Sequence, residues 1–193
     1  QIIGIIDLMP IIIDTLDQSI DGLEHLQNQN YSDSVVALDN AVQSLLVLDS
    51  QAKNITQDTF DPDNSRYIGQ SITVGIDLIQ ATRSFSNGLN IVSNSLINVF
   101  EIEENKIFLS LNKAIIEFQN TQIISRKATV EIVEIEIPEE LIRGNNQNVQ
   151  EYKNIIIQNL ELLNKNAYHM EKLTSSIILT VDGVKDLSEI FPN

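Results

Sequence analysis

Three aspartates near the N-terminus have the residue type and spacing that could bind a metal ion. Asp14, Asp17 and Asp21 are separated by three and four residues, so a helix would place their carboxylates on one face. Hard cations such as Ca²⁺ and Mg²⁺ prefer oxygen ligands of this kind. The alternative is a solvated acidic face opposite the apolar residues of the same helix. We favour that alternative and keep the three aspartates as candidate metal ligands.

Histidine chemistry is limited to His25 and His169. A di-iron helical bundle needs Glu-x-x-His on two helices, and the residues three positions before these histidines are Gly22 and Asn166. We therefore predict that both histidines lie at the surface or at the edge of a helix seam. The sequence also contains no cysteine, which excludes thiolate metal sites and cysteine nucleophiles.

Motifs for nucleophilic catalysis and for phosphate binding do not occur in the sequence. It has no Gly-x-Ser-x-Gly turn, no Gly-x-x-x-x-Gly-Lys loop and no Gly-x-Gly-x-x-Gly loop. We therefore predict a protein that is not an enzyme and uses no cofactor. Two threonines expected on inward helix faces, Thr82 and Thr174, remain candidate contacts for a small ligand.

The charge of the chain restricts its partners. It carries 27 acidic and 12 basic residues, a formal net charge of −15, and Arg126-Lys127 is the only adjacent basic pair. Nucleic-acid phosphates and anionic membrane surfaces would repel such a protein unless it had a local basic stripe. We predict that it binds neither, and that its partner is another protein or a second copy of itself.

The elements that position these residues are predicted from apolar periodicity. Apolar residues recur every seven positions near the C-terminus, which indicates one face of a helix of about 43 residues. This row consists of Val149, Ile156, Leu163, Met170, Ile177, Val184 and Phe191, and a second row of Leu160, Ala167, Thr174 and Val181 interleaves with it.

Another long helix is expected after the turn at 61–64. Its two predicted rows are Leu78, Phe85, Val92 and Val99, and Gly75, Thr82, Leu89 and Leu96. The small residues Gly75 and Thr82 predict a close approach by a neighbouring helix.

Three further helices are predicted from shorter apolar patterns. The first begins near Pro10 and buries Ile13, Leu16, Ile20, Leu23 and Leu26. The second is capped by Ser32 and buries Val35, Leu38, Val42, Leu45 and Ala52. The third begins near Glu103 and buries Phe108, Leu111, Ile115, Phe118 and Ile124.

Residues 129–148 are a candidate connector within a single domain that spans residues 1–193. The β-branched residues of 129–137 resemble a strand, but no second strand-like segment is available to pair with it. A continued helix or an extended connector is therefore expected. Pro138 is suited to start a short helix, which Gly144 and the polar run 145–148 would end.

A possible internal duplication relates the first helical hairpin to a later one. When residues 16–45 are aligned with residues 89–118, Leu38 matches Leu111, Ala41 matches Ala114 and Val42 matches Ile115. Heptad proteins also produce such matches by chance, so duplication and chance both stay open.

Together these patterns predict an all-α fold, an elongated antiparallel bundle of four to five long heptad-patterned helices. Such a bundle fits a non-enzymatic interaction or sensory module, and the alternative is a bundle that binds a small ligand or a divalent cation. Because the first residue is Gln1, we expect a processed product or an excised fragment, from which a signal peptide or a membrane anchor could have been removed. The apolar segment 2–13 is either a buried first helical turn, which we favour, or the edge of an ectodomain cut just outside a membrane anchor. An extracytoplasmic or cell-surface location is expected, and a cytoplasmic one stays open.

Overall fold

The computed structural model confirms an all-α fold. It describes residues 2–59, 62–97, 104–137 and 139–190, and the side chains of 8–54, 62–97, 106–137 and 150–183. Within these ranges the chain forms five helices and no strand. They are α1 (Ile2–Gln27), α2 (Tyr31–Thr59), α3 (Pro62–Ile97), α4 (Glu104–Glu134) and α5 (Glu139–Ile190).

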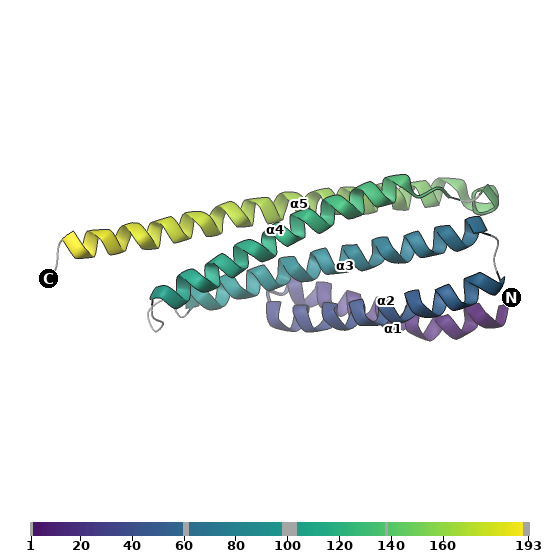
Figure 1. Cartoon of the computed structure of the whole chain (residues 1–193), viewed down its shortest axis with the longest axis horizontal. Coiled ribbons are helices and arrows are strands. Elements are labelled where there is room, and N and C mark those ends of the chain that lie inside the picture. Colours follow the sequence, from purple (N-terminus) through teal and green to yellow (C-terminus); the bar gives the residue numbers. More distant parts are fainter. Residues whose placement is uncertain (1, 60–61, 98–103, 138, 191–193) are drawn as a thin grey trace.

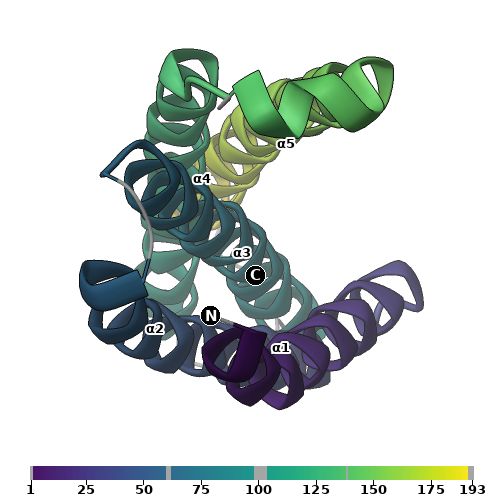
Figure 2. The same ribbon diagram turned by 90° about the vertical axis from the view of Figure 1, so that its right-hand side faces the viewer.

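The helices run alternately up and down the long axis of the molecule (Figure 1). Each packs mainly against its neighbours in sequence, and α3 additionally meets α5. Seen end-on, α1 and α2 lie on one side of α3, while α4 and α5 lie on the other (Figure 2). The C-terminal part of α5 projects beyond the ends of the other helices (Figure 1). The arrangement is an elongated array with α3 at its centre.

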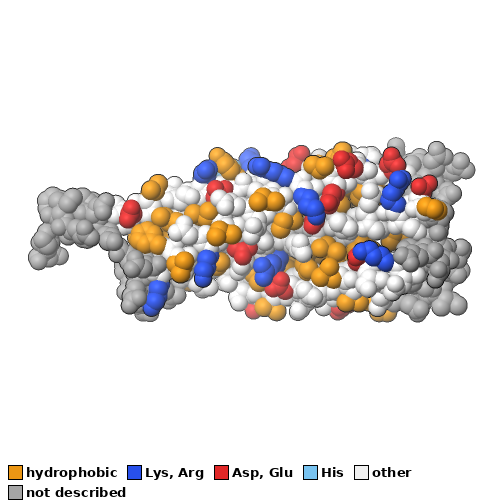
Figure 3. Space-filling view, in the orientation of Figure 1, with side chains coloured by type: hydrophobic (Ala, Val, Ile, Leu, Met, Phe, Trp, Pro, Cys, Tyr) orange, Lys and Arg blue, Asp and Glu red, His pale blue; other side chains and the backbone are white. Residues whose placement is uncertain are grey.

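The array leaves much of the chain exposed. Its solvent-accessible surface is 11,978 Å² for a mass of 21.7 kDa, whereas a compact monomer of that mass exposes about 9,200 Å². Apolar side chains lie among acidic and basic ones along the visible face (Figure 3). The open shape explains why many large apolar residues remain at the surface.

Small residues let α3 pack against several neighbours at once. Its buried residues are Val74, Asp77, Ala81, Thr82, Ser84, Ser86, Gly88, Val92 and Ser95. Of the two rows predicted for α3, the structure buries Val92 and Thr82 and half-buries Leu78, Phe85, Leu89 and Gly75. Leu96 is 44% exposed, contrary to the prediction, and Val99 lies outside the described residues.

Among the described glycines, Gly22 and Gly88 lie closest to a side chain of the neighbouring helix. A Cβ atom at Gly88 would lie 2.5 Å from Cε1 of Phe118, and one at Gly22 would lie 2.6 Å from Cγ of Leu38. At Gly75 the nearest atom, Leu45 Cδ1, would be 3.7 Å away, which is ordinary contact. A neighbouring helix therefore lies against Gly75, as predicted, but a side chain at this position would not have to displace it.

The rows predicted for α4 and α5 are largely confirmed. Leu160, Ala167 and Thr174 of α5 are fully buried, as are Leu111 and Phe118 of α4. The other described members of the α5 rows are half-buried, whereas Val149, Val184 and Phe191 fall outside the described side chains. Apolar residues of α4 and α5 thus pack together in two places, around Phe118 and Ala167 and around Ile132 and Ile156.

Two predicted helix starts differ from the structure. α1 begins at Ile2 and contains Pro10 inside the helix rather than at its start. α2 begins at Tyr31, where Asn30 and not Ser32 is the cap: the Asn30 carbonyl accepts from Ser34 N–H at 3.0 Å, and its side chain donates to Asp33 at 2.6 Å. The fourth helix begins at Glu104, one residue from the predicted position.

The connector at 129–148 is shorter than predicted. α4 continues to Glu134, and residues 135–137 then leave helical conformation. α5 runs without interruption from Glu139 through Gly144 to Ile190. The predicted helix end at Gly144 and the following polar run is wrong. Gly and Asn both have the backbone N–H that a helix needs, so a helix can continue through them.

Candidate interaction surface

The structure does not gather the three predicted aspartate ligands into a metal site. The carboxylate of Asp14 accepts hydrogen bonds from Gln18 Nε2 and from Ser44 Oγ of α2, both at 3.0 Å. Asp17 and Asp21 are exposed. Among the described residues, no three Asp, Glu or His side chains lie close enough together to hold a metal ion.

The other candidate site residues, two threonines and two histidines, do not form a binding site in the structure. Thr82 and Thr174 are buried, but each hydroxyl donates to a carbonyl of its own helix, Leu78 at 2.9 Å and Met170 at 2.7 Å. His169 is exposed with its ring edge-on to Tyr168, and His25 is half-buried in the last turn of α1. These positions match the surface or seam-edge placement expected for both histidines.

An exposed apolar face on α1 is the feature that the sequence analysis missed. Five residues at alternating spacings of four and three face solvent on this helix. They are Met9, Ile13, Leu16, Ile20 and Leu23, with 45%, 51%, 56%, 52% and 52% of each residue exposed. We call this set the α1 apolar face. The prediction that its last four members point inward is wrong.

The reason lies in where α2 meets α1. Among the α1 side chains that the structure describes, residues 8–27, the buried ones are Thr15 and Gly22, and the Gly22 carbonyl accepts a hydrogen bond from Ser34 of α2 at 2.7 Å. At 3.6 residues per turn, these positions lie roughly a third of a turn from the α1 apolar face. Since Leu38 needs the space that Gly22 provides, α2 packs on the small residues and leaves the large ones uncovered.

The two flanks of the α1 apolar face differ in charge. One flank carries Asp17 and Glu24, which are exposed. The other carries Ile12, Ser19 and Leu26, which are uncharged and half-buried. In heptad notation Ile13 and Ile20 occupy position a, Leu16 and Leu23 occupy d, the acids occupy e and the uncharged residues occupy g.

A second exposed apolar row on α4 does not form such a face. Leu109, Ile116, Ile123 and Val130 recur every seven residues and are 55–65% exposed. The positions three residues after the first three are Asn112, Gln119 and Arg126. A helix seam needs two interleaved apolar rows, and on α4 the second row is apolar only at Val133, three residues after Val130.

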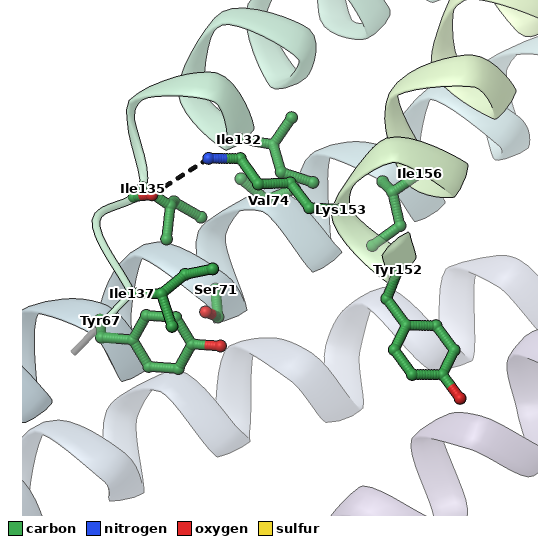
Figure 4. Close-up of a pocket in the computed structure, with 9 residues that line it drawn as sticks. All are labelled: Tyr67, Ser71, Val74, Ile132, Ile135, Ile137, Tyr152, Lys153 and Ile156. Atoms are coloured by element: carbon green, nitrogen blue, oxygen red, sulfur yellow. Dashed lines mark hydrogen bonds between the residues drawn. The ribbon is translucent and has the colours of Figure 1, made fainter. Parts of the chain in front are cut away.

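A small apolar pocket lies where α3, the end of α4 and α5 meet. It has a volume of about 150 Å³ and is walled mainly by Tyr67, Val74, Ile132, Ile135 and Ile156. Lys153 at its edge donates to the carbonyls of Val133 at 2.9 Å and Ile135 at 3.1 Å, while Tyr152 points away from the isoleucines (Figure 4). The ammonium group therefore caps the end of α4.

Charged groups with shifted pKa values link α3 to α4. The Lys127 ammonium lies 2.7 Å from Asp77 Oδ2 and 3.5 Å from Glu131 Oε1. Its hydrogen bond to Asp77 raises the pKa of Lys127. Burial raises the pKa of Glu131, the nearby Asp77 carboxyl adds to the effect, and Lys127 opposes it. The other oxygen, Glu131 Oε2, is buried without a hydrogen-bond partner.

A second polar contact joins α4 to α5. Glu171 accepts hydrogen bonds from Gln122 at 2.7 Å and Gln119 at 3.3 Å. The bond from Gln122 is the main cause that lowers the pKa of the Glu171 carboxyl. Between α2 and α3, Arg83 forms a two-pronged ion pair with Asp39 at 2.8 and 3.2 Å. Each of these charged contacts holds two neighbouring helices in register.

Comparison with known proteins identifies no counterpart: no family model, curated protein or solved structure matches this chain. Among the described residues, no helix has an apolar stretch long enough to cross a membrane.

Proposed function

We propose that this protein is a non-enzymatic interaction module that binds a partner helix on the α1 apolar face. The observation that carries the proposal is the exposure of both apolar rows of that helix, with Ile13, Leu16, Ile20 and Leu23 each more than half accessible. Contiguous apolar surface on a soluble domain commonly marks an interaction site. An amphipathic helix recognises a partner through anchors with this spacing.

The burial of the opposite side of α1 supports the same function. The packing of Leu38 against Gly22 and the hydrogen bond from Ser34 to the Gly22 carbonyl hold α1 against α2 before any partner arrives. A preformed docking helix does not lose backbone entropy on binding, which favours affinity. One form of such a module is the sensing region of a membrane-anchored receptor, in which helix shifts of about 1–2 Å carry the signal.

A labelled synthetic helix tests this function. The probe is a peptide of three heptads with Ile at a, Leu at d and Lys at e and g, and its fluorescence anisotropy is followed as the protein is added. We expect saturable binding with a Kd in the micromolar range. Binding should be lost in Ile20→Gln and kept in Ile123→Gln, which changes an isolated isoleucine of α4 that is 65% exposed.

Two results would overturn the proposed function. One is the absence of binding up to about 500 µM protein, which corresponds to less affinity than a few apolar anchors provide. The other is equal binding by the wild type and Ile20→Gln, because the peptide would then occupy a different surface.

A second candidate function is binding of a small apolar molecule in the pocket beside Ile135. A cavity of about 150 Å³ accommodates a ligand the size of a single aromatic ring, which is smaller than typical ligand pockets of about 300–1,000 Å³. A thermal-shift titration with benzene or indole tests it. A concentration-dependent rise in Tm that disappears in Ile135→Phe would favour this function, and no rise would exclude it.

A further inference from the structure

We infer that the partner of the α1 apolar face is a second copy of this chain, bound with the two α1 helices parallel. This inference rests on the proposed function and goes beyond it by naming the partner and its orientation. It is drawn from the residue types on the face, from the charges beside it and from the packing of α2.

The residue types on the face match those of a self-pairing helix. Position a holds Ile13 and Ile20, and position d holds Leu16 and Leu23. β-Branched residues at a with leucine at d favour parallel two-stranded coiled coils, in which each side chain packs beside its own counterpart. In the sequence, Ile6 and Met9 continue the same register one heptad earlier.

The charges beside the face favour the parallel orientation. In a parallel pair, residues at e meet residues at g of the other helix, so Glu24 would face the uncharged Ser19. In an antiparallel pair, e meets e, and Asp17 and Glu24 of the two copies would face each other. Repulsion between like charges at these positions disfavours the antiparallel pair.

The position of α2 leaves room for this pairing. α2 occupies the side of α1 that carries Thr15 and Gly22, roughly a third of a turn from the α1 apolar face. A two-fold axis running along the two α1 helices would therefore place each α2 outside the pair. Such an axis also makes the interface closed, because each copy presents the same patch to the other.

The net charge of the protein predicts an unusual salt dependence for this dimer. Each copy carries a formal charge of −15, so the two copies repel each other at low ionic strength. Salt screens this repulsion and leaves the apolar contact intact. Self-association should therefore tighten as NaCl rises, whereas binding of a basic helix from another protein would weaken.

Analytical ultracentrifugation of the whole chain tests the pairing. We expect a reversible monomer–dimer equilibrium between about 1 and 500 µM, with a dimer of twice the 21.7 kDa chain mass. Ile20→Gln should weaken self-association about thirtyfold or more, and the matched control Ile123→Gln should leave it unchanged. Circular dichroism of both variants verifies that the helices persist.

Disulfide trapping tests the orientation, because the wild-type sequence contains no cysteine. A parallel pair brings each a residue within disulfide reach of its own counterpart, with Cα atoms within about 7 Å. Ile13→Cys and Ile20→Cys should therefore each form a covalent dimer in a glutathione redox buffer, and Ile123→Cys should not. Failure of both α1 variants to cross-link would overturn the parallel orientation.

The outcomes separate this inference from the proposed function. A monomer at every concentration overturns the inference, and the proposed function then stands or falls with the peptide titration. A dimer that Ile20→Gln leaves intact overturns the inference as well. Self-association that weakens with salt would contradict the apolar homotypic contact and indicate an electrostatic one.

Discussion

Two glycines determine how closely the helices of each hairpin approach. Gly22 admits Leu38 in the α1–α2 pair, and Gly88 admits the ring of Phe118 in the α3–α4 pair. Phe118 is fully buried and also packs against Phe85 at a ring distance of 5.9 Å, so it has little room to move. The packing of the helices therefore depends on glycines, which have no side chain, as much as on the large residues that fill the space beside them.

Gly88→Ala is expected to destabilise the protein even though alanine is the better helix former. The new methyl group would lie 2.5 Å from the Phe118 ring, and such overpacking costs about 1–3 kcal/mol. The gain in helix propensity is about 1 kcal/mol. A net loss of up to about 2 kcal/mol should appear in urea denaturation.

Gly69→Ala is the matched control for that substitution. It lies in the same helix, and a Cβ atom there would meet nothing within 4 Å. It should stabilise the protein by about 0.5–1 kcal/mol. If both alanines stabilise equally, the close contact at Gly88 is contradicted.

Glu131 is expected to make the protein less stable as the pH rises. Its pKa is raised in the folded state, mainly by burial, so the folded state holds this proton more tightly than the unfolded state does. The resulting stability is present below the usual glutamate pKa and is lost as the pH rises through the raised value. Glu131→Gln should therefore gain stability relative to wild type at pH 8 and lose that advantage at pH 4.

Glu171 should show the opposite pH dependence. The hydrogen bonds from Gln122 and Gln119 lower its pKa, so its stability contribution is present above the usual glutamate pKa and is lost as the pH falls through the lowered value. Glu171→Gln should destabilise the protein at pH 7, with a difference that shrinks toward pH 3. Denaturation curves of both variants across this range would contradict the assignment if the two trends have the same sign.

At the scale of the elements, α5 stabilises the end of α4 through a lysine. Lys153 donates to the carbonyls of Val133 and Ile135, which lie where α4 ends and have no partner further along the helix. The chain can thus leave helical conformation at 135–137 while Ile135 stays buried.

Lys153→Met should loosen this junction without unfolding the bundle. Methionine keeps most of the apolar stem but removes the charged donor, and hydrogen bonds to charged groups contribute about 1.5–3 kcal/mol. We expect a lower Tm and faster amide exchange at 133–137. Lys165→Met, at an exposed position of the same helix, is the control. Equal effects of both variants would show that the carbonyl contacts do not stabilise the junction.

Heptad patterns predicted the positions of the helices well, but they did not predict which side of each helix is covered by a neighbouring helix. The predicted α5 rows agree with the structure because Ala167 packs in the same apolar cluster as Leu111 and Phe118 of α4. On α1 the same kind of pattern marks a face that no helix of this chain covers, since the space made by Gly22 directs α2 to another side. Apolar periodicity shows that one face of a helix is apolar. It does not show which face a second helix packs on, because that depends on how residues of both helices fit together, as Leu38 does against Gly22.

The candidate interaction surface was partly visible in the sequence. The spacing of Ile13, Leu16, Ile20 and Leu23 predicts an apolar face on this helix, but the spacing alone does not distinguish a face in the core from an exposed one. The signal that could have corrected this is the set of small residues, Thr15, Ser19 and Gly22, on another side of the helix. The type and spacing of the three aspartates make them candidate ligands of a shared metal site, yet Asp14 accepts a hydrogen bond from Ser44 of α2 rather than joining Asp17 and Asp21.

For the whole molecule, the array has a consequence for how it responds to a partner. Each helix meets mainly its neighbours in sequence, so α1 is connected to α3 chiefly through α2. The contacts along this route include the Ser34–Ser86 hydrogen bond at 3.0 Å and the Arg83–Asp39 ion pair. A shift of α1 on binding a partner would reach the rest of the molecule by that route.

The accessibility of position 20 at different protein concentrations tests the central claim most directly. In the Ile20→Cys variant, under reducing conditions, the thiol is reacted with a maleimide after removal of the reductant, and the rate is compared with that of Leu38→Cys, whose position is 1% exposed. We predict fast reaction at position 20 in dilute protein and slow reaction in concentrated protein, with position 38 protected throughout. Protection of position 20 at every dilution would place this face inside the monomer, and equal reactivity at every concentration would mean that no second copy covers it.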